Sequence, residues 1–233
     1  MATSHGNRAK LEPSTYALST MEGNLHLPLN SRLNTPPPQE AQPNTKGAVF
    51  VDRDGVIIED VHYLRESRQI RILPGVVPAL RSLQQHFYII VVTNQSGIAR
   101  GLLSEADLSL IHSDLVYQLA AQDTFIDALY YCPHLPQATV AKYRIICACR
   151  KPKGGMLLQA QSDWAIDLTR SFIVGDMLRD IEAGRAAGVR GVLIAADEPK
   201  GHLPEGLPPT PVASDLVQAA SYILAHPLNP APG

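Results

Sequence analysis

From residue 48 onward, hydrophobic positions gather in short continuous runs separated by longer amphipathic stretches. The runs are AVFV (48–51), YIIVV (88–92), FIDALYY (125–131), FIV (172–174) and GVLI (191–194). Several of them are apolar without alternation, which is typical of parallel strands covered on both faces. The pattern therefore predicts five strands in the centre of the protein.

The amphipathic stretches between these runs predict helices. One begins after Pro74-Gly75 and carries apolar residues as far as Leu83, and a second begins at Ser104, where SEAD has the pattern of a capping box. Further helices are expected over 156–164, 181–187 and 216–224. Strands that alternate with helices predict the α/β class, here a doubly wound, mostly parallel five-stranded sheet of the Rossmann type.

The chain is expected to form one domain with a tail at each end. Residues 1–46 contain TPPPQEAQPNTKG and no sustained apolar period, which predicts a disordered tail. Residues 47–226 fit a single domain, because domains commonly run to roughly 100–250 residues. Residues 227–233 form the second tail. The segment 56–74 is too short to hold a cap domain, which predicts an open site.

Composition disfavours several classes of partner. Apolar residues make up 45% of the chain, charged residues 18%, and the net charge is −2, which gives no electrostatic footprint for nucleic acid or anionic lipid. No apolar run approaches the roughly 18–20 residues of a membrane span, and the N-terminus lacks the apolar centre of a signal peptide. We therefore expect a cytoplasmic protein, and nothing in the sequence points to an obligate oligomer, so a monomer is expected.

Polar residues follow three of the predicted strands. The first strand is followed by Asp52-Arg53-Asp54-Gly55, the second runs into TNQSG from Thr93, and the fourth runs into Gly175-Asp176, with Asp180 one helical turn later. The carboxyl ends of parallel strands form the ligand site of open α/β sheets. Four carboxylates at one edge repel one another unless a cation is present, and Mg²⁺ prefers oxygen ligands. The alternative is that the carboxylates are ordinary solvated turn residues.

All three cysteines lie within residues 132–149. Cys132-x-His134 and Cys147-x-Cys149 supply three thiolates and one imidazole, the ligand set of a closed structural zinc site. The alternative is three buried thiols that cluster without a metal. Zinc would close the loop across residues 135–146 and fix Arg150 and Lys151, which follow the last ligand directly.

These motifs together resemble the haloacid dehalogenase-like phosphohydrolase superfamily, over residues 48–194. The resemblance implies that Asp52 is the nucleophile and forms an aspartyl-phosphate, while Asp54 acts as general acid and base. It implies that Mg²⁺ is held by Asp52, the carbonyl of Asp54 and Asp176. The phosphoryl group would be bound by Thr93 and Lys151, and Asp180 would orient its neighbours.

The loop that zinc would close, residues 135–146 (the zinc loop), narrows the resemblance to two related groups. CxH…CxCRKP is similar to D-glycero-D-manno-heptose 1,7-bisphosphate phosphatases and to histidinol-phosphate phosphatases, and a loop of twelve residues between His134 and Cys147 is similar to the heptose group. This implies removal of the 7-phosphate from a small sugar bisphosphate, with histidinol phosphate or another small phosphomonoester as the alternative. The residues implied in substrate binding are Asp60, Tyr63, Asn94, Gln95, Ser96 and Arg150.

Two positions depart from the heptose pattern, and one further class of function stays open. His62 stands where a Gly is familiar, and Met177 stands where a Lys often contacts substrate. A zinc-dependent nucleic-acid-binding module would need a basic stripe with stacking aromatics, whereas the sequence offers only a short basic patch. The histidines outside the cluster are given no role, and His112 is expected to be solvated or half-buried on its helix.

Overall fold

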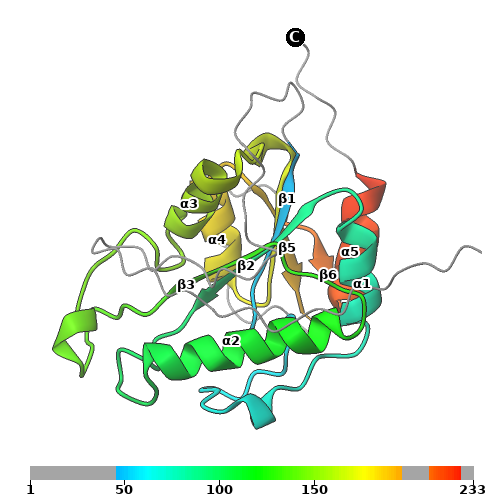
Figure 1. The fold of residues 1–233 in the computed structure, drawn as a ribbon. Coiled ribbons are helices and arrows are strands. Elements are labelled where there is room, and N and C mark those ends of the chain that lie inside the picture. Colours follow the sequence, from blue (N-terminus) through cyan, green and yellow to red (C-terminus); the bar gives the residue numbers. More distant parts are fainter. Residues whose placement is uncertain (1–45, 196–209, 227–233) are drawn as a thin grey trace, which may run out of the picture.

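The computed structural model describes residues 46–195 and 210–226 (Figure 1). Its centre is a six-stranded sheet in the order β3-β2-β1-β4-β5-β6, in which every neighbouring pair is parallel. The strands are β1 (Ala48–Val51), β2 (Tyr88–Asn94), β3 (Ala128–Cys132), β4 (Phe172–Gly175), β5 (Arg190–Ile194) and β6 (Val212–Ala213). The helices are α1 (Val76–Leu83), α2 (Glu105–Ala120), α3 (Gly155–Trp164), α4 (Leu178–Ala186) and α5 (Leu216–Ala225). The predicted doubly wound α/β fold is confirmed.

The sheet has one strand more than predicted. β6 contains only Val212 and Ala213, which pair with Leu193 and Ile194 of β5. The strand has only two residues, so it leaves no continuous apolar run in the sequence. Strands this short are set by the neighbouring strand rather than by their own composition.

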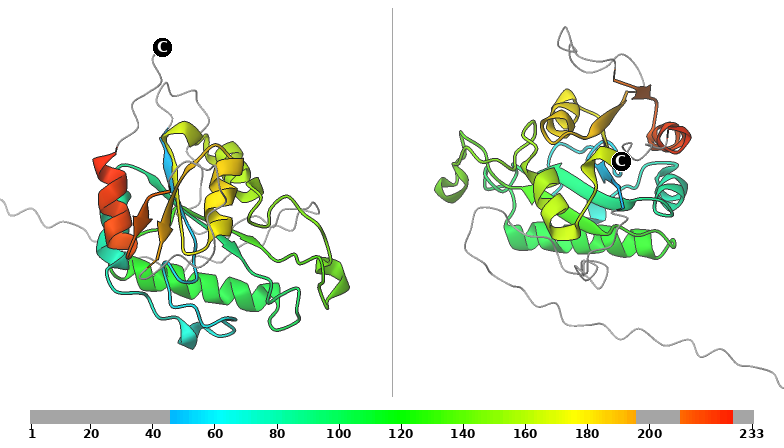
Figure 2. Two further views of the ribbon diagram at one scale, coloured as in Figure 1. Left: turned by 180° about the vertical axis from the view of Figure 1, so that it is seen from behind. Right: turned by 90° about the horizontal axis from the view of Figure 1, so that it is seen from above.

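Alternation of side chains along the strands divides the core into two layers. Val49 and Val51 of β1 pack in a cluster with α1, α2 and α5, whereas Ala48 and Phe50 pack in a cluster with α3 and α4. Figure 1 shows α3 and α4 on one side of the sheet and α1 and α5 on the other, and the view from above in Figure 2 separates the same layers. Both faces of the central strands are therefore covered, as parallel sheets require.

The predicted capping box begins α2. The hydroxyl of Ser104 accepts a hydrogen bond from the backbone N–H of Asp107 at 3.1 Å, and the Asp107 carboxylate accepts one from the N–H of Ser104 at 2.8 Å. These reciprocal bonds satisfy two backbone donors that a helix terminus otherwise leaves unpaired. They fix where α2 starts, and Ile111, Leu115 and Leu119 of α2 pack in the same core cluster as Val49 and Val51 of β1.

The connection between β1 and α1 is short. It contains one 3₁₀ turn (Ser67–Gln69) and isolated β-bridges that pair Ile58 with Asp54 and with Ile72. Residues 56–74 hold no cap domain, as the sequence predicts. The predicted tails, 1–46 and 227–233, lie outside the described residues except for Lys46. Within 46–195 and 210–226, every helix is too short or too polar to cross a bilayer.

Candidate active site and metal sites

The polar ends of β1, β2 and β4 meet at one edge of the sheet. These three strands are neighbours in the order β2-β1-β4 and run parallel, so their carboxyl ends lie side by side. Asp52 follows β1, Thr93 is the last residue but one of β2, and Asp176 follows β4. The convergence expected from the sequence is therefore present.

Asp52 lies against a buried ammonium group. The Nζ of Lys151 is 2.9 Å from Asp52 Oδ2 and 2.6 Å from Asp180 Oδ1, and it donates to the carbonyl of Val92 at 2.8 Å. Lys151 is 2% exposed and Asp180 0%. Burial raises the pKa of Asp52 to about 6, against the opposing effect of Lys151. For Lys151, burial alone would lower the pKa, but Asp52 and Asp180 hold it above its usual value.

Asp54 is held from two sides. The guanidinium of Arg53 donates to both Asp54 oxygens, from Nη2 at 2.9 Å to each and from Nε to Oδ1 at 3.2 Å. The amide of Gln95 donates to Asp54 Oδ2 at 2.9 Å and to the hydroxyl of Thr93 at 2.8 Å. The carboxyl group predicted to act as acid and base therefore has a fixed rotation.

The carboxylates at this edge fit a magnesium ion. Asp52, Asp176 and Asp180 each offer an oxygen, and these atoms lie within 4.8 Å of one another. Gly55 leaves room beside them, because a Cβ at this position would lie 2.5 Å from Asp176 Oδ2. Mg²⁺ takes oxygen ligands and is bound through few carboxylates together with substrate phosphate. Asp52 and Asp180 both contact Lys151, so the assignment of Asp52 and Asp176 as ligands, with Asp180 in support, stays a prediction.

Replacing Gly55 with Ala is expected to abolish magnesium-dependent activity. Gly55 has φ of 78°, where an L-residue is strained, and the added Cβ would also displace Asp176. Gly188→Ala is the matched control, since Gly188 has φ of 74° but nothing lies within 4 Å of an added Cβ. Both variants should lose about 1 kcal/mol of stability, measured by chemical denaturation. Only Gly55→Ala should lose phosphate release, and equal losses in both variants would contradict the assignment.

Magnesium is expected to stabilise the protein more at pH 7.5 than at pH 5. The Asp52 pKa rises from 3.8 unfolded to about 6 folded, so ionising Asp52 costs the fold about 3 kcal/mol above pH 6. This cost is absent below about pH 4 and grows between the two values. A bound cation offsets it only where Asp52 is ionised. Thermal unfolding with and without Mg²⁺ measures the effect, and an equal rise in Tm at both pH values would be inconsistent with it.

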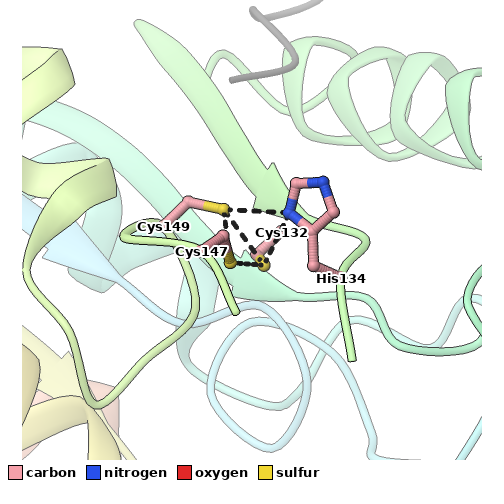
Figure 3. A group of neighbouring side chains, drawn as sticks. All are labelled: Cys132, His134, Cys147 and Cys149. Carbon is pink, nitrogen blue, oxygen red and sulfur yellow. Dashed lines mark hydrogen bonds between the residues drawn. The ribbon is translucent and has the colours of Figure 1, made fainter. Parts of the chain in front are cut away.

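The three cysteines and His134 surround a common centre (Figure 3). The three Sγ–Sγ distances are 3.2, 3.2 and 3.5 Å, and Nδ1 of His134 is 3.3 Å from Cys149 Sγ and 3.7 Å from Cys132 Sγ. A tetrahedral zinc ion about 2.3 Å from each sulfur separates the sulfurs by about 3.8 Å. The donor types and the near-tetrahedral spacing fit zinc, with all four positions taken by protein.

The zinc loop is joined directly to the active site. Nη1 of Arg150 donates to the carbonyl of His134 at 3.1 Å. The side chain of Asn94 clamps Lys151, donating to its carbonyl at 3.1 Å and accepting from its N–H at 3.1 Å. The thiol cluster and the end of β2 therefore set the position of Lys151 together.

The predicted substrate residues are only partly brought together. Arg150 and Ser96 are half-buried near the strand ends. Tyr63 lies beneath the guanidinium of Arg100, at 5.9 Å from the ring centroid. Asp60 is exposed and accepts from the N–H of His62 at 2.7 Å. The side chains of Asn94 and Gln95 bond to protein groups, so their predicted contact with substrate stays a prediction.

His62 occupies a backbone conformation that favours glycine. Its φ is 67°, in the left-handed region. This gives a physical reason why glycine is familiar at the position and shows that this chain accommodates a side chain there.

An acidic cavity of about 780 Å³ opens beside Asp176. Its lining includes the carboxylates of Glu59, Asp60, Asp176 and Asp215, and no Lys or Arg among the lining residues that the structure describes. A phosphate group in this cavity would be repelled, so the cavity suits the uncharged or cationic part of a substrate.

Arg53 and His112 belong to the site and were not predicted from the sequence. His112 was expected to be solvated or half-buried, but it is 0% exposed, and its Nε2 lies 3.0 Å from Nη1 of Arg53. Burial, followed by the charge of Arg53, holds the His112 pKa well below its usual value. The position of His112 on the buried face of α2, one turn after Leu108, was the available signal.

Residues 148–219 match a family model described as HAD-hydrolase-like. A solved structure of D,D-heptose 1,7-bisphosphate phosphatase from B. bronchiseptica, complexed with magnesium and phosphate, aligns with a TM-score of 0.67 at 34% identity. The alignment covers 77% of this chain and 99% of that one. The fold is thus that of haloacid dehalogenase-like hydrolases.

Curated relatives are similar over most of their length. D-glycero-beta-D-manno-heptose-1,7-bisphosphate 7-phosphatase of Rhodopseudomonas palustris is 42% identical over 62% of this chain and 81% of its own. The enzyme of the same name from Haemophilus influenzae is 43% identical over 69% of this chain and 88% of its own. The chain belongs to this phosphatase family of phosphoric monoester hydrolases.

Proposed function

We propose that the protein removes the 7-phosphate of D-glycero-D-manno-heptose 1,7-bisphosphate through an aspartyl-phosphate on Asp52. The observation that carries the proposal is the buried carboxylate of Asp52, set 2.9 Å from Lys151 and within 4.8 Å of the other metal-binding carboxylates. The names of the relatives support the substrate.

The chain's own residues divide the reaction into two displacements. Asp52 attacks phosphorus, and the bond from phosphorus to the sugar oxygen breaks while Asp54 gives its proton to that oxygen. Asp54 then takes a proton from water, which attacks phosphorus and frees Asp52. Lys151 and Thr93 bind phosphoryl oxygens, and Asp180 holds Lys151 through its 2.6 Å contact. Asp52, Asp176 and the Asp54 carbonyl would hold Mg²⁺, whose positive charge would offset the negative charge of the phosphoryl oxygens.

The charge distribution around the site supports an orientation for a bisphosphate. The acidic cavity beside Asp176 disfavours the distal phosphate, whereas the planar guanidinium of Arg150 can bind two of its oxygens. The distal phosphate then lies toward the zinc loop. Asp60, Tyr63, Asn94, Gln95 and Ser96 complete the proposed substrate contacts.

Zinc has a structural role in this proposal. Cys132, His134, Cys147 and Cys149 would fill a tetrahedral shell and would leave no open coordination position. The ion would hold the loop from which Arg150 and Lys151 emerge. The expectation of a cytoplasmic monomer that binds neither nucleic acid nor membrane stays a prediction from composition.

Phosphate release from heptose 1,7-bisphosphate and from histidinol phosphate tests the proposal, each with and without Mg²⁺. We expect magnesium-dependent release with a strong preference for the heptose, and none from Asp52→Asn. If the protein prefers histidinol phosphate, the proposed substrate is wrong. The acidic cavity would then bind the ammonium group of histidinol phosphate. Absence of magnesium-dependent release from either ester would refute the enzymatic proposal.

A further inference from the structure

Arg53 extends from the active-site turn into the protein interior. It lies between the proposed nucleophile and the proposed acid, yet it is only 1% exposed. One edge of its guanidinium, Nε and Nη2, bonds to the Asp54 carboxylate. The other nitrogen, Nη1, lies 3.0 Å from Nε2 of His112 on α2. Arg53 therefore joins the active site to a helix on the face of the sheet.

The contact with Arg53 fixes the tautomer of His112. A guanidinium carries only N–H donors, so Nε2 of His112 must accept with its lone pair. A ring whose Nε2 accepts is neutral and carries its proton on Nδ1. Full burial and the neighbouring positive charge both disfavour the imidazolium, which agrees with the lowered pKa. His112 is thus an acceptor for Arg53.

His112 is a costly residue at its position. The other buried residues of α2 are apolar: Leu108, Ile111, Leu115 and Leu119. The Nδ1 of His112 is buried and finds no hydrogen-bond partner among the residues that the structure describes, and the ring packs at a tilt against Tyr131. An apolar side chain would leave no polar atom unsatisfied. Only a residue with a hydrogen-bond acceptor at this position can accept the bond that Arg53 donates to Nε2.

We propose that His112 is a positioning residue for the acid–base carboxyl of Asp54, acting through Arg53. The inference rests on the proposed function, in which Asp54 protonates the leaving group. Without an acceptor at Nε2, one end of the guanidinium loses its partner, and the three hydrogen bonds to Asp54 lose part of their fixed direction. Gln95 then remains as the other described side-chain donor to Asp54, through a single bond.

This role predicts a dependence on the leaving group. An alkyl ester such as the heptose 7-phosphate needs a proton on its leaving oxygen, whereas p-nitrophenolate leaves without one. A displaced Asp54 therefore slows the alkyl ester more than p-nitrophenyl phosphate. Because general acids contribute about 10²–10⁴-fold, losing part of this contribution should change the ratio of the two kcat/KM values by about tenfold.

The test compares variants of His112 in the full-length protein with magnesium and zinc bound. His112→Leu keeps a side chain of similar volume and removes the acceptor, whereas His112→Gln can place its carbonyl oxygen near the position of Nε2. His112→Asn is polar but too short to reach, and it replaces the Leu variant if that protein does not fold. Leu119→Ala, about two turns further along the same buried face, controls for loosening of α2.

We expect the ratio of kcat/KM for p-nitrophenyl phosphate over the heptose ester to rise about tenfold in His112→Leu and His112→Asn. His112→Gln should restore it, and Leu119→Ala should leave it unchanged. A constant ratio in all variants of an active protein would overturn this inference alone. A wild-type protein that released phosphate from neither ester would overturn the proposed function as well.

Discussion

Replacing Asp52 with Asn is expected to lower kcat by at least about 10⁴-fold while the fold is retained. An amide cannot attack phosphorus as a carboxylate does. Asparagine keeps the shape and the hydrogen bond from the N–H of Arg53, which is 2.7 Å long in the wild type. Steady-state phosphate release with the heptose ester measures the loss.

The metal-free Asp52→Asn protein should also be the more stable one at neutral pH. It no longer has to hold a buried carboxylate ionised above its folded pKa of about 6, and Asp180 still neutralises Lys151. Asp163→Asn is the control, because Asp163 is a partly buried carboxylate that accepts from Tyr130 on the α3 side of the sheet. Residual turnover close to wild type in Asp52→Asn would exclude Asp52 as the nucleophile.

Replacing Cys149 with Ser is expected to release zinc and to lower Tm by about 6–12 °C. The estimate assumes a loss of about 3 kcal/mol, less than the roughly 10–16 kcal/mol of isolated zinc fingers, because a packed sheet supports this loop. Activity should fall strongly, since Arg150 and Lys151 follow the lost ligand directly. Zinc content by atomic absorption, thermal unfolding and phosphate release are measured on the same sample.

Ile146→Ser is the control for the zinc prediction. Ile146 lies in the same loop, beside Cys147, but is 80% exposed and offers no ligand. This variant should keep its zinc, its Tm and its activity. Full activity of Cys149→Ser without zinc would show that the loop holds its shape unaided and that the metal has no structural role.

The fold was largely predictable because most of its strands are continuous apolar runs in a parallel sheet. AVFV and YIIVV are buried at every apolar position except Tyr88, and both faces of the sheet are covered as the lack of alternation indicates. β6 was missed because a strand of two residues carries no period of its own. The convergence of Asp52, Thr93 and Asp176 followed from strand direction alone.

The fine structure of the site could not be predicted, because long-range partners decide it. The sequence predicts Gln95 and Asn94 as substrate ligands. The amide of Gln95 bonds to Asp54, 41 residues away, and the amide of Asn94 bonds to the backbone of Lys151, 57 residues away. Arg53 occupies the variable position of an Asp-x-Asp pattern, and its acceptor is 59 residues away on α2. The local pattern of polar and apolar residues gives no information about hydrogen-bond partners so far apart in the sequence.

The most direct test of the account is phosphorus NMR of heptose 1,7-bisphosphate incubated with the protein and Mg²⁺. The account predicts that the signal of the 7-phosphate disappears and that of inorganic phosphate grows, while the 1-phosphate persists. Omitting Mg²⁺ or using Asp52→Asn should leave both ester signals unchanged. Loss of the 1-phosphate first, or persistence of both esters in the complete reaction, would contradict the central claim.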